Sequence, residues 1–88
     1  MNNIIRNHKL KILPEYFNAV SDGTKTFEIR FNDRGYAVGD VLILREWTIA
    51  GGYTGRVIRK RVTYVLDDGT YLKEGYVALG LSDAENNS

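Results

Sequence analysis

The clearest alternation of polar and apolar residues in the chain lies within Gly23-Thr24-Lys25-Thr26-Phe27-Glu28-Ile29-Arg30-Phe31-Asn32-Asp33-Arg34. In an extended chain, successive side chains point to opposite faces, so Phe27, Ile29 and Phe31 share one face of a strand. The side chains of the other face are polar: Thr26, Glu28, Arg30 and Asn32. We expect a strand over residues 25–32 whose apolar face packs into the core.

The polar face of this strand has two interpretations. It is a solvated surface on which Glu28 and Arg30 form a neighbouring ion pair. Alternatively it is a ligand site, in which Arg30 and Lys25 grip an anion or a base and Glu28 orients it. The sequence leaves both open.

The composition limits the number of domains and the kinds of chemistry open to this chain. The chain has 88 residues, 43% of them hydrophobic and 26% charged, which indicates one globular domain over residues 1–88 with an ordered core at about 7–82. It has no cysteine, which excludes disulfides, thiolate metal sites and a cysteine nucleophile. No metal or other cofactor is expected.

No apolar run approaches the roughly 20 residues of a membrane span, and the N-terminus lacks a signal-peptide pattern. A cytoplasmic protein is expected.

The net charge of +1 does not signal nucleic acid, but the basic residues are unevenly placed. Arg56, Arg59, Lys60 and Arg61 fall within one short segment. They indicate either an edge strand protected by charge or a patch that faces phosphates. Whether this segment shares a face with Arg30 stays open.

The remaining elements follow from periodicity and turn residues. The spacing of Leu13, Tyr16, Phe17 and Val20 predicts a helix over Pro14–Ser21 with one buried face. His8, the only histidine, is either a structural hydrogen bonder or a ligand contact. Further strands are predicted over 7–13, 41–48, 54–66 (with a bulge or bend near Lys60) and 76–81. In the last of these, Val77, Leu79 and Leu81 point inward. Residues 83–88 are expected to fray.

About five strands and one short helix, without βα alternation, predict a mainly β (α+β) fold. The expected architecture is a small closed or half-closed β-barrel.

Several motifs are similar to a known family. They are Gly23-x-Lys25-Thr26-x-Glu28-x-Arg30, Val38-Gly39-Asp40-x-Leu42, His8 to Ile12, Asn32-Asp33-Arg34, Leu42 to Glu46 and Glu74 to Val77. The chain resembles the ASCH superfamily, and within it a small uncharacterised ASCH-like family of bacteria and their phages. The resemblance covers residues 8–81. It implies a PUA-like β-barrel and a role near RNA or modified nucleosides.

One ASCH branch contains amidohydrolases that use a lysine and a threonine on the matching strand. Lys25 matches the lysine, but the threonine position holds Glu28, so the resemblance carries no complete catalytic set. Glu28 could act as a general base on water while Lys25 stabilises negative charge. The catalytic candidates are therefore Lys25 and Glu28, in a hydrolase of modified nucleosides or in a metal-free ribonuclease.

The leading hypothesis is an RNA-binding domain with a basic cleft. Its expected contacts are Lys25, Glu28, Arg30, Asn32, Asp33, Arg34, Arg45, Arg59 and Arg61. Tyr36, Tyr53 or Trp47 would offer stacking surfaces for unpaired bases. The alternatives are the hydrolase and a protein-interaction scaffold of a phage or its host. Ligand identity and oligomeric state stay open.

Overall fold

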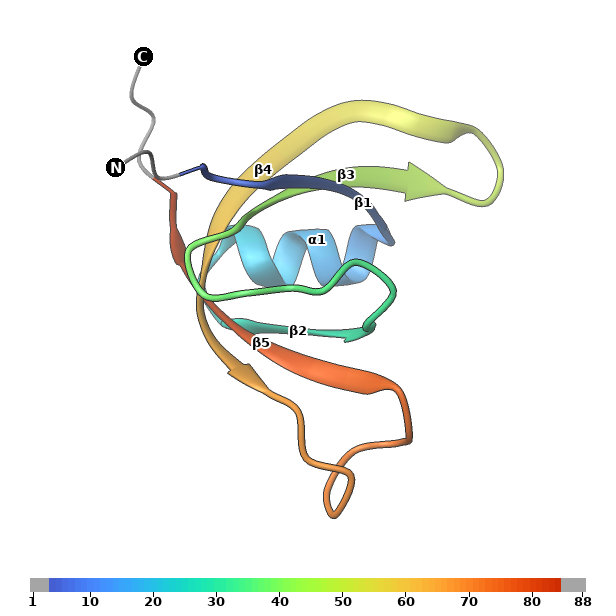
Figure 1. Cartoon of the computed structure of the whole chain (residues 1–88). Helices are drawn as coiled ribbons and strands as arrows, with labels where there is room; N and C mark the ends of the chain where they lie inside the picture. Colours follow the sequence, from blue (N-terminus) through green and yellow to red (C-terminus); the bar gives the residue numbers. More distant parts are fainter. Residues whose placement is uncertain (1–3, 85–88) are drawn as a thin grey trace.

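The computed structural model describes residues 4–84 and contains five strands and one helix (Figure 1). Their bounds are β1 (Asn7–Ile12), α1 (Pro14–Ser21), β2 (Phe27–Phe31), β3 (Val41–Thr48), β4 (Gly52–Leu66) and β5 (Tyr76–Asp83). The predicted fold class is confirmed, and α1 and β3 have the predicted bounds. Strand β5 extends through Asp83, two residues past its predicted end. The fraying expected from residue 83 onward is wrong for Asp83, which pairs with Lys60, and residues 85–88 lie outside the described part. Within residues 4–84, no helix is long and apolar enough to cross a membrane.

The five strands form one mixed sheet in the order β1-β3-β4-β5-β2. Strands β1 and β3 are parallel, and the other pairs are antiparallel. The sheet curls into a half-barrel, because the 15-residue β4 pairs with β3 along its first part and with β5 along its second (Figure 1). The register of β4 against β5 shifts between Val62 and Tyr64, slightly beyond the bend predicted near Lys60. Such a bulge increases the local twist.

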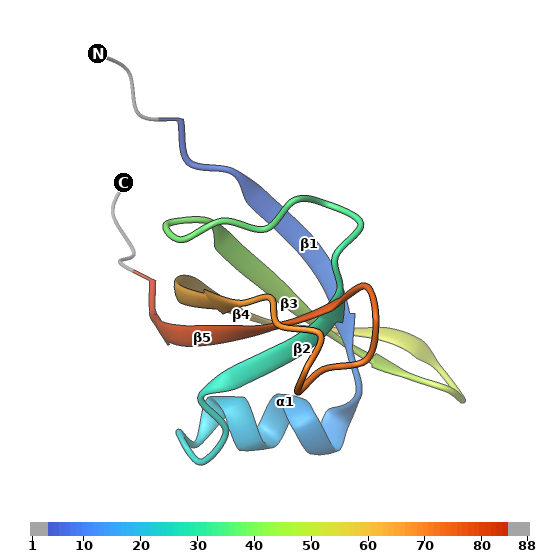
Figure 2. The same ribbon diagram turned by 60° about the horizontal axis from the view of Figure 1, so that its bottom comes forward.

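Helix α1 begins at Pro14, whose fixed φ suits a first helical turn. It ends where Gly23 adopts a φ of +86°, a left-handed conformation that glycine takes without strain. Phe17 and Val20 are buried, as predicted. The prediction that Leu13 and Tyr16 share that buried face is wrong, since 37% and 45% of their surfaces are exposed. Both lie toward the open side of the half-barrel, across which α1 extends (Figure 2).

The core fills the inside of the half-barrel. Val77 and Leu79 of β5 are fully buried and Leu81 packs against the core, which confirms their predicted inward direction. The buried members of the core are Leu10, Ile12, Phe17, Val20, Tyr36, Leu42, Leu44, Val62, Val77 and Leu79. Every strand except β2 contributes a hydrophobic side chain to this cluster.

Strand β2 is inverted relative to the prediction. Phe27, Ile29 and Phe31 are 45%, 50% and 55% exposed, whereas only 4% of Glu28 is exposed. The register explains this, because Glu28 pairs with Leu79 and both side chains therefore point inward. Side chains from both sides of β2 line a pocket on the open side of the half-barrel, and neighbouring cations neutralise the Glu28 carboxylate there.

Candidate functional site

Strands β1 and β2 are the two edges of the sheet, and the gap between them is the open seam of the half-barrel. Two arginines cross this seam. Arg30 Nη2 donates a hydrogen bond to the Lys11 carbonyl oxygen at 2.9 Å, and Arg34 Nη1 donates to the Lys9 carbonyl oxygen at 3.1 Å. These guanidinium groups thus satisfy edge carbonyls of β1 that no strand pairs, and they connect its free edge to the β2 region.

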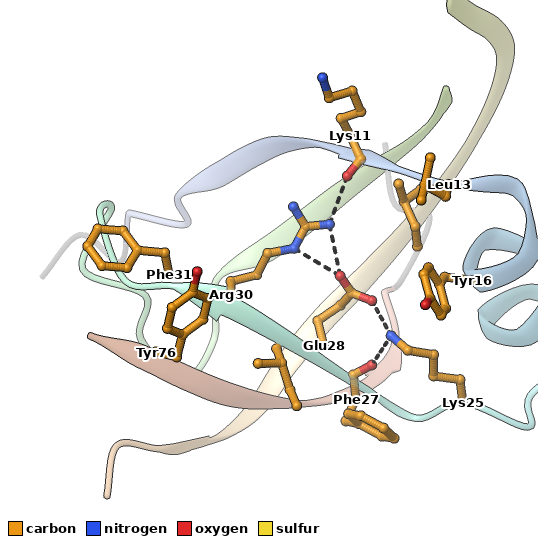
Figure 3. Close-up of a pocket in the computed structure, with 11 residues that line it drawn as sticks. Lys11, Leu13, Tyr16, Lys25, Phe27, Glu28, Arg30, Phe31 and Tyr76 are labelled. Atoms are coloured by element: carbon orange, nitrogen blue, oxygen red, sulfur yellow. Dashed lines mark hydrogen bonds and ion pairs between the residues drawn. The ribbon is translucent and has the colours of Figure 1, made fainter. Parts of the chain in front are cut away.

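Glu28 lies between two cations at the seam (Figure 3). Arg30 Nε donates to Glu28 Oε2 at 2.9 Å, and Lys25 Nζ donates to Glu28 Oε1. Lys25 also donates to the Phe27 carbonyl oxygen at 2.7 Å. The predicted ion pair of Glu28 and Arg30 is therefore real, but it is largely buried rather than solvated. We call these three side chains the seam cluster.

An open pocket of about 590 Å³ lies over the seam cluster. Its walls come from β1, the start of α1, β2 and the start of β5: Lys11, Ile12, Leu13, Tyr16, Lys25, Phe27, Glu28, Ile29, Arg30, Phe31 and Tyr76. Figure 3 shows the guanidinium of Arg30 between Glu28 and the backbone of Lys11. The pocket combines apolar walls with the seam cluster, whose two cations and one carboxylate leave one excess positive charge, and this suits a small ligand with an anionic or hydrogen-bonding edge.

The turn after β2 holds the other predicted contacts of this region. The Asn32 side-chain oxygen accepts a hydrogen bond from the Tyr36 N–H at 3.1 Å, which shapes the turn. Asp33 is exposed and lies 3.9 Å from Arg34 Nε. The Arg34 guanidinium is hydrogen-bonded to the Lys9 carbonyl oxygen at the edge of β1.

His8 belongs to a second paired cluster on the inward side. Its Nε2 lies 2.8 Å from Asp40 Oδ2, and Arg6 Nη2 lies 2.9 Å from the same oxygen. Burial raises the pKa of Asp40, but hydrogen bonds from His8, Arg6 and the Ala37 N–H outweigh it and hold that pKa below its usual value. Both His8 and Asp40 are buried, so the structural interpretation of the lone histidine fits the geometry. Among residues 4–84, no group of three or more His, Cys, Asp or Glu side chains could hold a metal ion.

The remaining predicted cations lie on the opposite side of the sheet. Leu42 is fully buried and pairs with Lys60, so the flanking Arg59 and Arg61 point outward. Arg30 pairs with the buried Val77 and points inward. The sequence left open whether Arg30 and the 56–61 segment share a face. Arg59 and Arg61 do not share it.

The outward side of β1, β3 and the first part of β4 carries a surface that we call the basic face. Aligned register positions place Lys9 beside Ile43 and Arg59, and Lys11 beside Arg45 and Val57. The five cations of this face are Lys9, Lys11, Arg45, Arg59 and Arg61. In the part of the chain that the structure describes, none of the five forms a salt bridge.

Two aromatic rings lie at one end of the basic face. Trp47 pairs with Tyr53 across β3 and β4. The Lys11 ammonium lies 4.3 Å from the Trp47 ring centroid, and the Arg45 guanidinium lies 3.9 Å from that of Tyr53. Each ring thus carries a cation over its face, and Tyr53 is half exposed. This arrangement offers positive charge and planar surfaces together.

The sequence-predicted site therefore divides into two. Lys25, Glu28 and Arg30 form the seam cluster, while Arg45, Arg59 and Arg61 belong to the basic face with Trp47 and Tyr53. Tyr36, the third predicted stacking residue, is buried against His8, with ring centroids 4.9 Å apart. Lys9 and Lys11 were missed. Their alternation with His8, Leu10 and Ile12 already placed them opposite the core, but the parallel pairing of β1 with β3 was not visible in the sequence.

Residues 7–81 match the model of a protein family described as a domain of unknown function, DUF3850. The chain is also 44% identical, over 72 residues, to a protein of Escherichia phage P2 described as "Uncharacterized 12.9 kDa protein in GpA 3'region". The match covers 82% of this chain but 64% of the phage protein, so the chain spans less than two thirds of that relative's length.

Proposed function

Since the chain belongs to the DUF3850 family, whose function is unknown, we propose a function from its own geometry: the domain binds single-stranded RNA across the basic face. The observation that carries the proposal is the set of five outward cations without salt-bridge partners in the described chain. They lie on three adjacent strands, about 5 Å apart from one strand to the next. A polyanion is the ligand class that such a surface attracts.

The aromatic end of the face favours a single strand over a duplex. Unpaired bases stack on aromatic rings and on guanidinium planes, and both are present where Arg45 covers Tyr53. Bases within a duplex are already stacked and are not available for this contact. The resemblance to the ASCH superfamily, with its PUA-like barrel, supports RNA rather than DNA as the nucleic acid.

A binding titration with a short single-stranded RNA at two salt concentrations tests the proposal. The affinity of the wild-type domain should fall steeply with salt, because bound cations release counterions from the phosphates. The double variant Arg45→Gln/Arg59→Gln should weaken binding and reduce the salt dependence. The matched control is Lys73→Gln, which removes an exposed cation from the loop before β5 and should leave the affinity unchanged. Equal affinities of the double variant and the wild type would contradict the proposal.

The alternative proposal is a hydrolase of modified nucleosides or RNA that uses Glu28 and Lys25 in the seam pocket. A proton transfer to Glu28 would require one of its ion pairs, with Lys25 or Arg30, to loosen. The same titration samples test this alternative when they are analysed for cleaved or deacylated product. Product that forms with the wild type but not with Glu28→Gln would favour it. A protein-interaction scaffold, the third proposal, predicts neither RNA affinity nor product.

A further inference from the structure

The basic face ends at the aromatic pair of Trp47 and Tyr53. Beyond this pair, β3 and β4 continue for only one more register position, Thr48 with Gly52, before the chain turns back. The Gly51 N–H donates a hydrogen bond to Thr48 Oγ1 at 2.9 Å, which closes the turn. In Figure 1 this hairpin reaches further out than the end of β1. The aromatic pair is therefore the last row of the basic face.

The cations of the basic face all lie on one side of the aromatic pair. Along β4, Arg59 and Arg61 follow Tyr53 by six and eight residues. On the other side of the pair, residues 48–52 contain no charged side chain. Their most exposed hydrophobic member, Ile49, is 85% exposed. The positive charge of the face therefore stops at the aromatic pair.

Arg56 lies close to the hairpin in the sequence, but it does not extend the basic face. Its Nη2 donates a hydrogen bond to Asn18 Oδ1 at 3.1 Å, and its guanidinium lies 4.4 Å from the Phe17 ring centroid. Its Nη1 lies 3.6 Å from a carboxylate oxygen of the buried Glu46. These contacts hold Arg56 against α1, on the inward side of the sheet.

The length of the basic face suits a short single strand. Tyr53 and Arg61 are eight residues apart on β4, a distance of about 26 Å in an extended chain. Arg59 and Arg61 are about 6.6 Å apart along the strand, which is similar to the spacing of successive phosphates in extended RNA. Arg61 Nη1 donates to the Gly39 carbonyl oxygen at 3.0 Å, which positions its guanidinium at the far end of the face. An extended RNA of about four or five nucleotides therefore covers the face.

We infer that the basic face binds the end of a single RNA strand. The terminal base stacks on the aromatic pair, and the phosphates of the following nucleotides lie along the cations toward Arg61. An internal segment must continue past the aromatic pair, where its next phosphates meet the neutral residues 48–52 instead of a cation. This inference rests on the proposed RNA binding and deepens it, because it names the kind of RNA: a strand with a free end.

A linear RNA and its circular form test the inference. The probe is a strand of about 24 adenosine and cytidine nucleotides, which is several times the expected footprint and does not pair with itself. Trp47 is the only tryptophan in the sequence, so its fluorescence reports whether a base stacks there. The linear form should bind roughly tenfold more tightly than the circle, quench Trp47 and carry at most two copies of the domain, one per end. The circle should bind weakly and leave the fluorescence unchanged.

A positive charge placed beyond the aromatic pair should weaken the preference for an end. Ile49 is 85% exposed, so its substitution should not disturb the fold, and thermal melting checks this. Ile49→Lys supplies a cation where the face has none, and it should raise the affinity for the circle several-fold more than the affinity for the linear RNA. The matched control, Ile49→Gln, is polar but neutral and should keep the wild-type preference.

The outcomes separate this inference from the proposed function. Binding of neither RNA would overturn both. Salt-dependent binding of the two forms with equal affinity, or several copies side by side on the linear strand, would support RNA binding and overturn the preference for an end. A linear strand that binds without quenching Trp47 would overturn it as well, as would an Ile49→Lys variant whose ratio of the two affinities equals that of the wild type.

Discussion

The seam cluster and the basic face both contain lysine and arginine side chains, but those of the seam cluster are paired with a carboxylate and those of the basic face are not. In the seam cluster, the charges of Lys25 and Arg30 are met by a buried carboxylate and by backbone carbonyls. On the basic face, Arg45 and Arg59 lie outward without an acidic partner among residues 4–84. The net charge of +1 does not reveal this difference. In the folded chain, a carboxylate lies beside the cations of the seam cluster, whereas the cations of the basic face have no acidic partner among residues 4–84. Paired cations stabilise the fold, whereas unpaired ones remain available to a ligand.

Glu28→Gln is expected to have the largest effect, with a loss of stability in the seam cluster and no change in RNA binding by the basic face. This substitution removes the buried charge that holds Lys25 and Arg30, and it should lower the free energy of unfolding by about 3 kcal/mol. Urea denaturation followed by circular dichroism measures this loss. RNA affinity of the folded variant should stay close to that of the wild type. A variant with unchanged stability and lost affinity would mean that the seam cluster, rather than the basic face, contacts the ligand.

The double substitution Arg45→Gln/Arg59→Gln should have the reverse profile. We expect RNA affinity to fall roughly thirtyfold, or about 2 kcal/mol, because two charge-assisted phosphate contacts are lost. The slope of log K against log salt should fall by about 0.7 per contact. Melting temperature should hardly change, since neither arginine forms a salt bridge in the described chain. A large drop in melting temperature would contradict the prediction, because it would show that the two arginines stabilise the fold.

A pair of substitutions at Tyr53 separates stacking from charge on the basic face. Tyr53→Ala should reduce affinity roughly tenfold, about 1.4 kcal/mol, if a base stacks at this end. Its salt slope should equal that of the wild type. Tyr53→Phe keeps the ring under Arg45 and should bind like the wild type. Fluorescence titration of the three proteins decides the point. Equal losses in both variants would assign the effect to the hydroxyl instead.

The smallest expected effect concerns Asp40, a paired carboxylate like Glu28. Its pKa is lowered in the folded state, so its stabilising contribution is present above the unfolded value of about 3.9 and is lost as pH falls through the folded pKa. Asp40→Asn should therefore show a flatter decline of stability below about pH 4 than the wild type. Thermal melts across this pH range measure it. Parallel declines in the two proteins would show that other carboxylates dominate the acid sensitivity.

The sequence predicted local structure better than it predicted which face is buried. Pro14 and Gly23 marked the limits of α1, and the apolar run from Val41 to Leu44 marked β3, because turn chemistry and hydrophobicity act locally. Alternation in β2 identified which side chains share a face, but a period of two is symmetric and does not state which face points inward. That choice depends on the pairing of Glu28 with Leu79, 51 positions further along the chain.

The candidate site was predicted as a list of residues rather than as surfaces. Arg45, Arg59 and Arg61 were predicted as contacts together with Arg30, while the sequence left open whether the 56–61 segment shares a face with Arg30. Strand order separates them, and it follows from the parallel pairing of β1 with β3 and the bend in β4. Neither has a local signature in the sequence. Lys9 and Lys11 were not predicted as contacts, because they join the basic face only through the pairing of β1 with β3.

The position of β5 in the sheet has a consequence for how the chain folds. Strand β5 comes last among the five along the chain, yet it lies between β4 and β2 and is the neighbour to which β2 is hydrogen-bonded. Until β5 is available, β2 has both edges unpaired and its phenylalanines have no neighbour. Pairings of such long sequence separation form slowly. We therefore expect β2 to join the sheet late, and a chain interrupted after Leu66 to be prone to aggregation.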